Sequence, residues 1–161
     1  MSRGAGPGPA RSRVAIVRGS IDPGEVLALV GGAGDGAVLL FLGTVRDHAD
    51  GRRVDGLRYE AYQEMAEGVL GTIADEAAGQ IGSDRIAVVH RIGDLAIGEV
   101  SVAIAVSSPH RAEAYQASRY VIEEIKKRLP VWKLEQYVDG EAAWVAGRKL
   151  EAIAEPKEVA R

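Results

Sequence analysis

Two lysines on either side of a proline are the residues of this chain best suited to chemistry. Lys126 falls near the end of a predicted helix, and Lys133 follows Trp132 on an extended segment. Pro130 lies between them, and proline lacks an N–H and clashes with the preceding turn, so we expect the helix to end near Arg128. A lysine beside a bulky aromatic can be partly desolvated, which lowers its pKa. Two such amines facing one pocket would suit an anionic substrate or an acyl group under attack.

The same cations also have a purely structural interpretation. Lysine and arginine at a helix C-terminus complement the macrodipole, and this is the commoner role for Lys126 or its neighbours Lys127 and Arg128. A further cation, Arg46, follows the apolar run 37–42. It is either a solvated loop residue or an anion clamp, because loops that leave buried strands often carry function.

A second group of cations lies at the opposite end of the same helix. Ser108 and Pro109 are typical of a helix start, with Ser108 as the cap, and His110 and Arg111 then fall in the first turn. Free backbone N–H groups and the dipole make that position favourable for anions and unfavourable for a cation. Arg111 is therefore either a solvated cation in an unfavourable position or part of a site that binds an anion.

These two groups cannot meet within one chain. His110 and Lys126 are 16 residues apart, which is about 24 Å along a helix. The chain therefore has either two separate sites or a symmetric dimer that brings the two helix ends together. We favour the dimer.

The elements that must position these residues are both strands and helices. No internal repeat or domain boundary is evident, so we expect one catalytic domain at 14–147, between a disordered arm at 1–13 and a charged tail at 148–161. The run 37–42 is expected to be a central strand, and the alternating strand 100–107 carries small residues on one face, where a helix could pack closely. The periodicities predict strands at 14–17, 37–42, 57–62, 85–92, 100–107, 131–138 and 141–145, and helices at 23–30, 63–81 and 109–128.

Composition excludes several classes of function. The chain has 161 residues with 47% apolar content and a net charge of −3, which argues against a general nucleic-acid coat. It has no cysteine, so disulfides, thiolate zinc sites and cysteine nucleophiles are ruled out. We find no metal-ligand spacing and no need for a cofactor, and His90, alone in an apolar strand, is expected to be structural. With no membrane span and no signal peptide, a cytoplasmic protein is expected.

Five segments, in this order and spacing, resemble the catalytic (large) subunit of molybdopterin synthase. The resemblance covers about 14–145, nearly all of the chain outside the tails. Each motif alone is weak, but the five together are highly specific. They are FLGTVRDH (41–48), YEAY (59–62), VVHRIG (88–93), SSPHR (107–111) and IKKRLPVWK (125–133).

The resemblance implies a concrete activity. The family converts cyclic pyranopterin monophosphate (precursor Z) to molybdopterin by installing a dithiolene. The sulfur arrives as a thiocarboxylate on the C-terminal Gly-Gly of a small ubiquitin-like carrier subunit. The family forms a homodimer with one carrier subunit at each end, a heterotetramer. Its fold is α+β, an α/β hammerhead in which a mixed or antiparallel sheet is covered by two long helices, with an extra small antiparallel sheet.

The resemblance also implies roles for particular residues. Lys126 and Lys133 match the essential lysines, with Lys126 as main acid/base and Lys133 holding the carrier's tail or a developing oxyanion. Leu134 stands at a position where many relatives carry a basic residue. A leucine side chain cannot bind an anion, so only the backbone of Leu134 could contact substrate. The positions that match substrate contacts are Thr44, Val45, Arg46, His110, Arg111, Lys126, Lys133, Leu134 and Glu135.

Two other functions compete with this interpretation. A non-catalytic paralogue would bind the carrier or a phosphorylated ligand without turnover, although the presence of both Lys126 and Lys133 argues against it. A hydrolase of small phosphate esters would use the same cations, but the sequence offers no evident nucleophile or metal site for it.

Overall fold

The structure, a computed structural model, describes residues 12–82 and 85–145. Neither of the two long helices in these segments contains a run of apolar residues that could span a bilayer. The elements are β1 (Ser12–Val17), α1 (Pro23–Leu27), β2 (Ala37–Thr44), β3 (His48–Ala49), β4 (Arg52–Ala61), α2 (Gln63–Ile81), β5 (Arg85–Arg91), β6 (Gly93–Ala96), β7 (Val100–Ser108), α3 (Arg111–Arg128), β8 (Val131–Tyr137) and β9 (Ala142–Val145).

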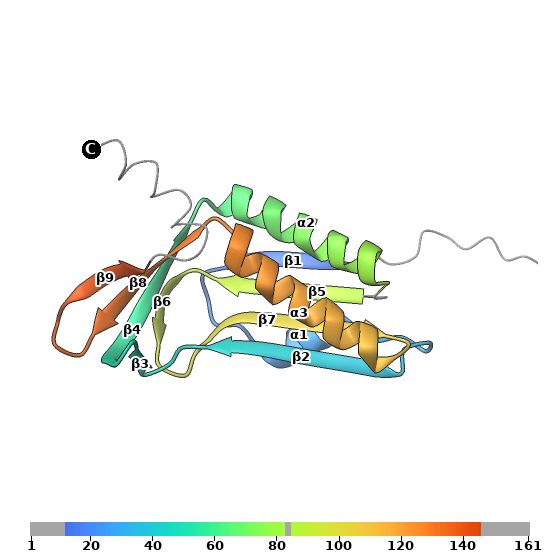
Figure 1. Cartoon of the computed structure of the whole chain (residues 1–161), viewed down its shortest axis with the longest axis horizontal. Helices are drawn as coiled ribbons and strands as arrows, with labels where there is room; N and C mark the ends of the chain where they lie inside the picture. The colour runs from blue at the N-terminus through green and yellow to red at the C-terminus, as the bar shows by residue number, and fades with distance from the viewer. Residues whose placement is uncertain (1–11, 83–84, 146–161) are drawn as a thin grey trace, which may run out of the picture.

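A four-stranded mixed sheet forms the centre of the molecule, in the order β1-β5-β7-β2. β1 and β5 are parallel, and the other pairs are antiparallel. The long helices α2 and α3 cover one face of this sheet (Figure 1). Leu70 of α2 and Val121 of α3 are fully buried in one core cluster with Ile104 of β7; α2 packs on β1 and β5, and α3 packs on β7 and β2. This layering confirms the predicted sheet covered by two long helices.

The small side chains of β7 face the other way. Ala103 and Ala105 pack against Val26 of the short helix α1, which lies across the opposite face of the sheet. A side chain as small as alanine lets a helix approach the sheet closely. The predicted close packing of a helix on this face is thus confirmed, and the helix is α1.

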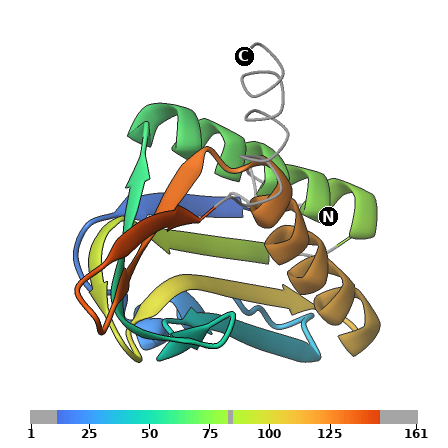
Figure 2. The ribbon, with the colours of Figure 1, turned by 60° about the vertical axis from the view of Figure 1, so that its left-hand side comes forward.

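An antiparallel sheet is attached to one end of the first sheet (Figures 1 and 2). Its order is β3-β4-β8-β9, with β6 pairing to β4. In the central pair, Tyr59 of β4 lies opposite Lys133 of β8. A turn at Asp139 and Gly140 closes the β8–β9 hairpin between the two predicted strands, and Gly140 has the positive φ of 91° that favours glycine. The extra antiparallel sheet is therefore confirmed.

The junction between α3 and β8 connects the helix layer on the first sheet to the second, antiparallel sheet. α3 ends at Arg128, and Leu129 leaves the helix with φ −68° and ψ 124°, the extended geometry that a following proline imposes. Leu129 and Pro130 are both buried, so the turn is anchored in the protein. As predicted, Lys126 lies in the last helical turn and Lys133 lies on the outgoing strand.

Several predicted boundaries are wrong, including the start of β4 at Arg52 rather than 57, and at the start of α3 the reason is that strand pairing outweighs a local signal. Ser108 does not cap α3; it stays in β7, pairs with Ala37 and is fully buried, and His110 is the N-cap. α1 ends at Leu27 rather than near Val30. The short strand β6 was not predicted, since the sequence there indicated only a turn region.

The position of β2 in the sheet is also different from the prediction. The apolar run was expected to be a central strand, but β2 lies at an edge among the described residues. Its outer face leaves Val38 52% exposed, which a continuous apolar run does not reveal. At the termini, β1 begins at Ser12, two residues inside the segment expected to be an arm. The predicted tail at 148–161 lies outside the described residues.

Candidate active site

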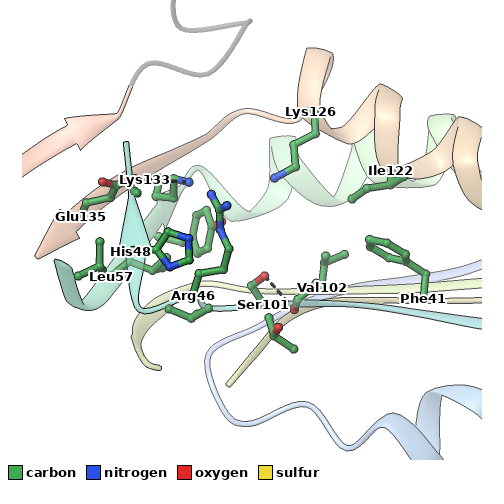
Figure 3. A pocket seen from close by; sticks show the side chains of 16 residues that line it. Phe41, Arg46, His48, Leu57, Ser101, Val102, Ile122, Lys126, Lys133 and Glu135 are labelled. Carbon is green, nitrogen blue, oxygen red and sulfur yellow. Dashed lines mark hydrogen bonds and ion pairs between the residues drawn. The ribbon is translucent and has the colours of Figure 1, made fainter. Parts of the chain in front are cut away.

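A cavity of ≈ 170 Å³ lies where the two sheets meet the end of α3. Figure 3 shows Lys126 from α3 and Lys133 from β8 reaching toward the same space, with Arg46 between them. Arg46 comes from the loop that follows β2. The cavity is lined by Phe41, Gly43, Thr44, Val45, Arg46, His48, Ala49, Val54, Leu57, Tyr59, Ser101, Val102, Ile122, Lys126, Lys133 and Glu135.

Lys126 is presented by the last turn of α3. Ile122, one turn earlier on the same side of the helix, also lines the cavity, which explains why the lysine points inward. Partial burial lowers the pKa of Lys126, and the nearby charges of Lys133 and Arg46 lower it further. Three cations in one cavity favour the binding of an anion and disfavour full protonation of the group.

Lys133 shares its face of β8 with a buried carboxylate. Glu135, two residues along the strand, is only 7% exposed. Its Oε1 lies 3.8 Å from Lys133 Nζ, and its Oε2 accepts a hydrogen bond of 2.9 Å from the Tyr137 hydroxyl. The carboxylate thus balances part of the positive charge in the cavity.

The floor of the cavity is built from β4 and β7. Burial raises the pKa of Tyr59, which is 8% exposed, and the Ser101 hydroxyl donates to Gly43 O at 3.2 Å. His90 packs edge-to-face on Tyr59 with ring centroids 5.1 Å apart. Burial lowers the pKa of His90 to about 4, and the charge of Lys126 acts in the same direction. His90 is therefore neutral and structural, as predicted.

The structure brings together most, but not all, of the residues predicted for the site. Thr44, Val45, Arg46, Lys126, Lys133 and Glu135 line the cavity. Leu134 does not, because side chains alternate along a strand and it points to the other face of the sheet, opposite Trp144. His110 and Arg111 are exposed at the far end of α3, outside the described set of lining residues.

Several lining residues were not predicted from the sequence. Tyr59 and Ser101 form part of the floor, and Phe41 and Ile122 form apolar walls. The alternation of strand 57–62 indicated that Tyr59 faces inward, but not that a cavity lies there. Lys133 faces Tyr59 only because β4 and β8 pair, and this register is not visible in either segment alone.

Comparison with known proteins decides the family. Residues 16–128 match the model of the MoaE protein family. The chain belongs to the MoaE family. It is 49% identical over 122 residues to the molybdopterin synthase catalytic subunit of Halalkalibacterium halodurans, covering 76% of this chain and 77% of that protein. It is 43% identical over 144 residues to the subunit of the same name from Bacillus subtilis, covering 89% and 90%.

A solved structure of a MoaE relative has the same fold. The X-ray crystal structure of molybdopterin synthase from Staphylococcus aureus matches with a TM-score of 0.77 and 41% identity, covering 82% of this chain and 96% of that chain. The family model ends at Arg128, but the Bacillus subtilis match covers so much of the chain that it necessarily spans Lys133 as well. The likeness to MoaE proteins therefore includes both sides of the cavity.

The donors in this MoaE chain suit anions rather than metals. Within residues 12–82 and 85–145, no group of three or more His, Cys, Asp or Glu could hold a metal ion. Arginine offers a planar fork of N–H donors to a phosphate, and each lysine offers a compact charge. Such donors, fixed around a small cavity, can bind a phosphorylated substrate and stabilise an oxyanion as it forms.

Proposed function

We propose that this chain is the catalytic subunit of a molybdopterin synthase. It transfers sulfur from the C-terminal thiocarboxylate of a small ubiquitin-like carrier subunit to cyclic pyranopterin monophosphate, and so forms the dithiolene of molybdopterin. The observation that carries this proposal is the convergence of Arg46, Lys126 and Lys133 on one small cavity. Membership of the MoaE family, whose relatives bear this name, supports it.

The cavity supports a division of roles among the cations. Lys126 is the main acid/base, because its lowered pKa brings the amine closer to proton exchange at neutral pH. Lys133 holds the carrier's tail or the oxyanion that develops at the thiocarboxylate carbon. Arg46 binds the phosphate of the pterin substrate through its planar fork of donors.

A chain without cysteine can handle sulfur when the sulfur arrives on a partner. Each transfer replaces a carbon–oxygen bond of the pterin substrate's side chain by a carbon–sulfur bond and breaks the carbon–sulfur bond of the thiocarboxylate. The carrier is left with an ordinary C-terminal carboxylate, whose second oxygen comes from water. A dithiolene has two sulfurs, so two thiocarboxylated carriers are consumed for each product. The relatives' name, catalytic subunit, is consistent with a second subunit of this kind.

A symmetric dimer would complete the site with His110 and Arg111. β2 begins beside the N-terminus of α3, where Gly36 N donates to Pro109 O at 3.2 Å, and it ends at the cavity. Two β2 edges paired antiparallel about a two-fold axis would place the start of one strand, about 27 Å long, beside the end of the other. Arg111 of one subunit would then approach the partner's cavity.

The exposed side chains of β2 support such an interface. Val38 is 52% exposed and Leu42 is 37% exposed on this edge strand. An edge strand with apolar side chains is a ready template for pairing with another chain. With one carrier subunit on each site, the assembly is a heterotetramer.

Turnover with a thiocarboxylated carrier tests the proposal. The purified chain, the cyclic monophosphate and the carrier are mixed, and the two-sulfur product is measured by mass spectrometry. We expect product with the thiocarboxylate and none with the same carrier ending in a carboxylate. Binding of the carrier without product would instead indicate a non-catalytic paralogue. Release of phosphate from simple esters would indicate a hydrolase.

A further inference from the structure

The carboxylate of Glu135 divides its two oxygens between different partners. Oε2 accepts a hydrogen bond of 2.9 Å from the Tyr137 hydroxyl, while Oε1 faces Lys133 Nζ at 3.8 Å. The three residues alternate along β8 and therefore share one face of the strand. Glu135 is 7% exposed, and a buried carboxylate needs such partners to offset the loss of water.

The distance between Lys133 and Glu135 has a chemical consequence. At 3.8 Å the two groups attract each other electrostatically, but they are too far apart for a hydrogen bond. An ammonium group carries three N–H donors, and Glu135 engages none of those of Lys133. The donors remain available to an anion in the cavity.

The Tyr137 ring is itself fixed from outside the cavity. Arg52 of β4 lies over it, with its guanidinium carbon 3.6 Å from the ring centroid. Arg52 is held in turn by Asp139 at 2.8 Å and Glu141 at 3.0 Å, on either side of the hairpin turn. The hydrogen bond to Glu135 raises the pKa of Tyr137, so its hydroxyl keeps the proton that it donates.

We propose that Tyr137 is a positioning residue for Lys133 and acts through Glu135. Its hydroxyl holds one carboxylate oxygen, so that Glu135 balances the charge of Lys133 without capturing the N–H donors that Lys133 presents to the cavity. The use of those donors on the carrier's tail rests on the proposed function. The arrangement of Tyr137, Glu135 and Lys133 does not rest on it.

Removal of the hydroxyl should change the reactivity of Lys133. In Tyr137→Phe, Oε2 loses its donor, and the carboxylate turns toward Lys133 to regain a hydrogen bond. A closer carboxylate favours the charged ammonium, whereas only the neutral amine reacts with acylating reagents. The other titratable or charged groups that face the cavity stay the same in this variant, namely Arg46, His48, Tyr59 and Lys126.

Amine labelling of the intact protein tests the proposal without any need for turnover. Acetic anhydride is applied over a range of pH, and the labelled fraction of Lys133 is read from its peptide by mass spectrometry. In Tyr137→Phe we expect Lys133 to react roughly threefold more slowly than in wild type, because the closer carboxylate engages its N–H donors. The exposed Lys127 serves as the internal reference, and Tyr115→Phe, on an exposed tyrosine of α3, is the control variant.

A second variant should change the labelling rate of Lys133 in the opposite direction. Glu135→Gln removes the negative charge, so Lys133 should react faster than in wild type. Equal labelling of Lys133 in wild type and Tyr137→Phe, with both folded by circular dichroism, would overturn the proposal. If the labelling shifts as expected in a protein without synthase activity, the positioning role stands and the proposed function fails.

Discussion

Lys126 is held in surroundings that disfavour its charged form. Partial burial and the charges of Lys133 and Arg46 place its pKa below the 10.5 of an ordinary lysine. Each of these causes can be changed separately, and Arg46 is the simplest to remove because it comes from an exposed loop. The titration of Lys126 is therefore a residue-scale test of how the cations act together.

The pH dependence of turnover should report this coupling. We take the charged ammonium of Lys126 as the active form, so kcat/KM should fall as pH rises through its pKa, at a value below 10.5. Arg46→Gln removes a neighbouring positive charge, which raises the pKa of Lys126 and moves this fall to higher pH. The pH–rate profiles of both proteins check the shift, beside Arg53→Gln as an exposed control. A fall at the same pH in all three would contradict the coupling.

At the residue scale, the sequence predicted the cations better than the rest of the cavity. Lys126 and Lys133 were found from the proline break, whose geometric consequences are local. Tyr59 and Ser101 could not be assigned to the cavity, because they reach it through the pairing of β4 with β8 and of β7 with β2. Alternation along a strand shows which face is buried but not what lies against it.

The end of α3 is tied to α2 by a cluster of ionic hydrogen bonds. Arg128 donates to both oxygens of Glu76, at 2.6 and 3.0 Å, and the Tyr120 hydroxyl donates to Glu76 at 2.7 Å. Arg128 lies two residues after Lys126, so the same contacts hold the turn that presents the lysine. These bonds, first from Arg128 and then from Tyr120, lower the pKa of Glu76.

Loss of this cluster should destabilise the protein in a pH-dependent manner. Because the folded state lowers the pKa of Glu76, its stabilising effect is fully present above pH 4.5, the pKa of an ordinary glutamate, and is lost as pH falls through the lower pKa of the folded state. Glu76→Gln should therefore lower the melting temperature at pH 7, and the difference from wild type should shrink in acid. Thermal unfolding of wild type and Glu76→Gln, followed by circular dichroism at pH 7 and in acid, measures this difference in melting temperature.

A matched control for this prediction exists on α3 itself. Arg119 and Glu123 form an exposed i,i+4 pair at 3.0 Å, and such pairs contribute little to stability. Glu123→Gln should thus lower the melting temperature less than Glu76→Gln does. An equal or larger effect of Glu123→Gln would count against the cluster as the anchor of the helix end.

At the element scale, the sequence predicted the elements better than their arrangement. The helix 63–81 and the break after Arg128 are as predicted, since periodicity and proline act locally. The cap at Ser108 was wrong because pairing with Ala37 in the sheet keeps that residue extended. The edge position of β2 depends on the strand order, which no single segment encodes.

At the scale of the whole molecule, the cavity in one subunit lacks two of the residues assigned to it by resemblance. His110 and Arg111 lie at the far end of α3, as the length of the helix required. A dimer with shared sites would unite them with Lys126 of the other subunit. This arrangement makes a specific prediction about mixed dimers.

Mixed dimers of two inactive variants should regain activity. Lys126→Ala and Arg111→Ala subunits, given different tags and expressed together, would form a dimer with one doubly altered site and one intact site. We expect about half the wild-type kcat per dimer, while each variant alone stays inactive or nearly so. If each site is built within one chain, both sites carry a defect and no activity returns.

Two adjacent lysines at the end of α3 allow a direct test of the chemistry assigned to Lys126. Both side chains are exposed, but Lys126 lines the cavity, whereas Lys127 does not and pairs with Glu124 at 3.4 Å. In the dithiolene-forming assay with thiocarboxylated carrier, Lys126→Ala should reduce kcat by about 10²- to 10⁴-fold, with the fold preserved. Lys127→Ala should retain nearly full activity. Similar rates for wild type and both variants would contradict the account, because they would remove Lys126 from the chemistry of the site.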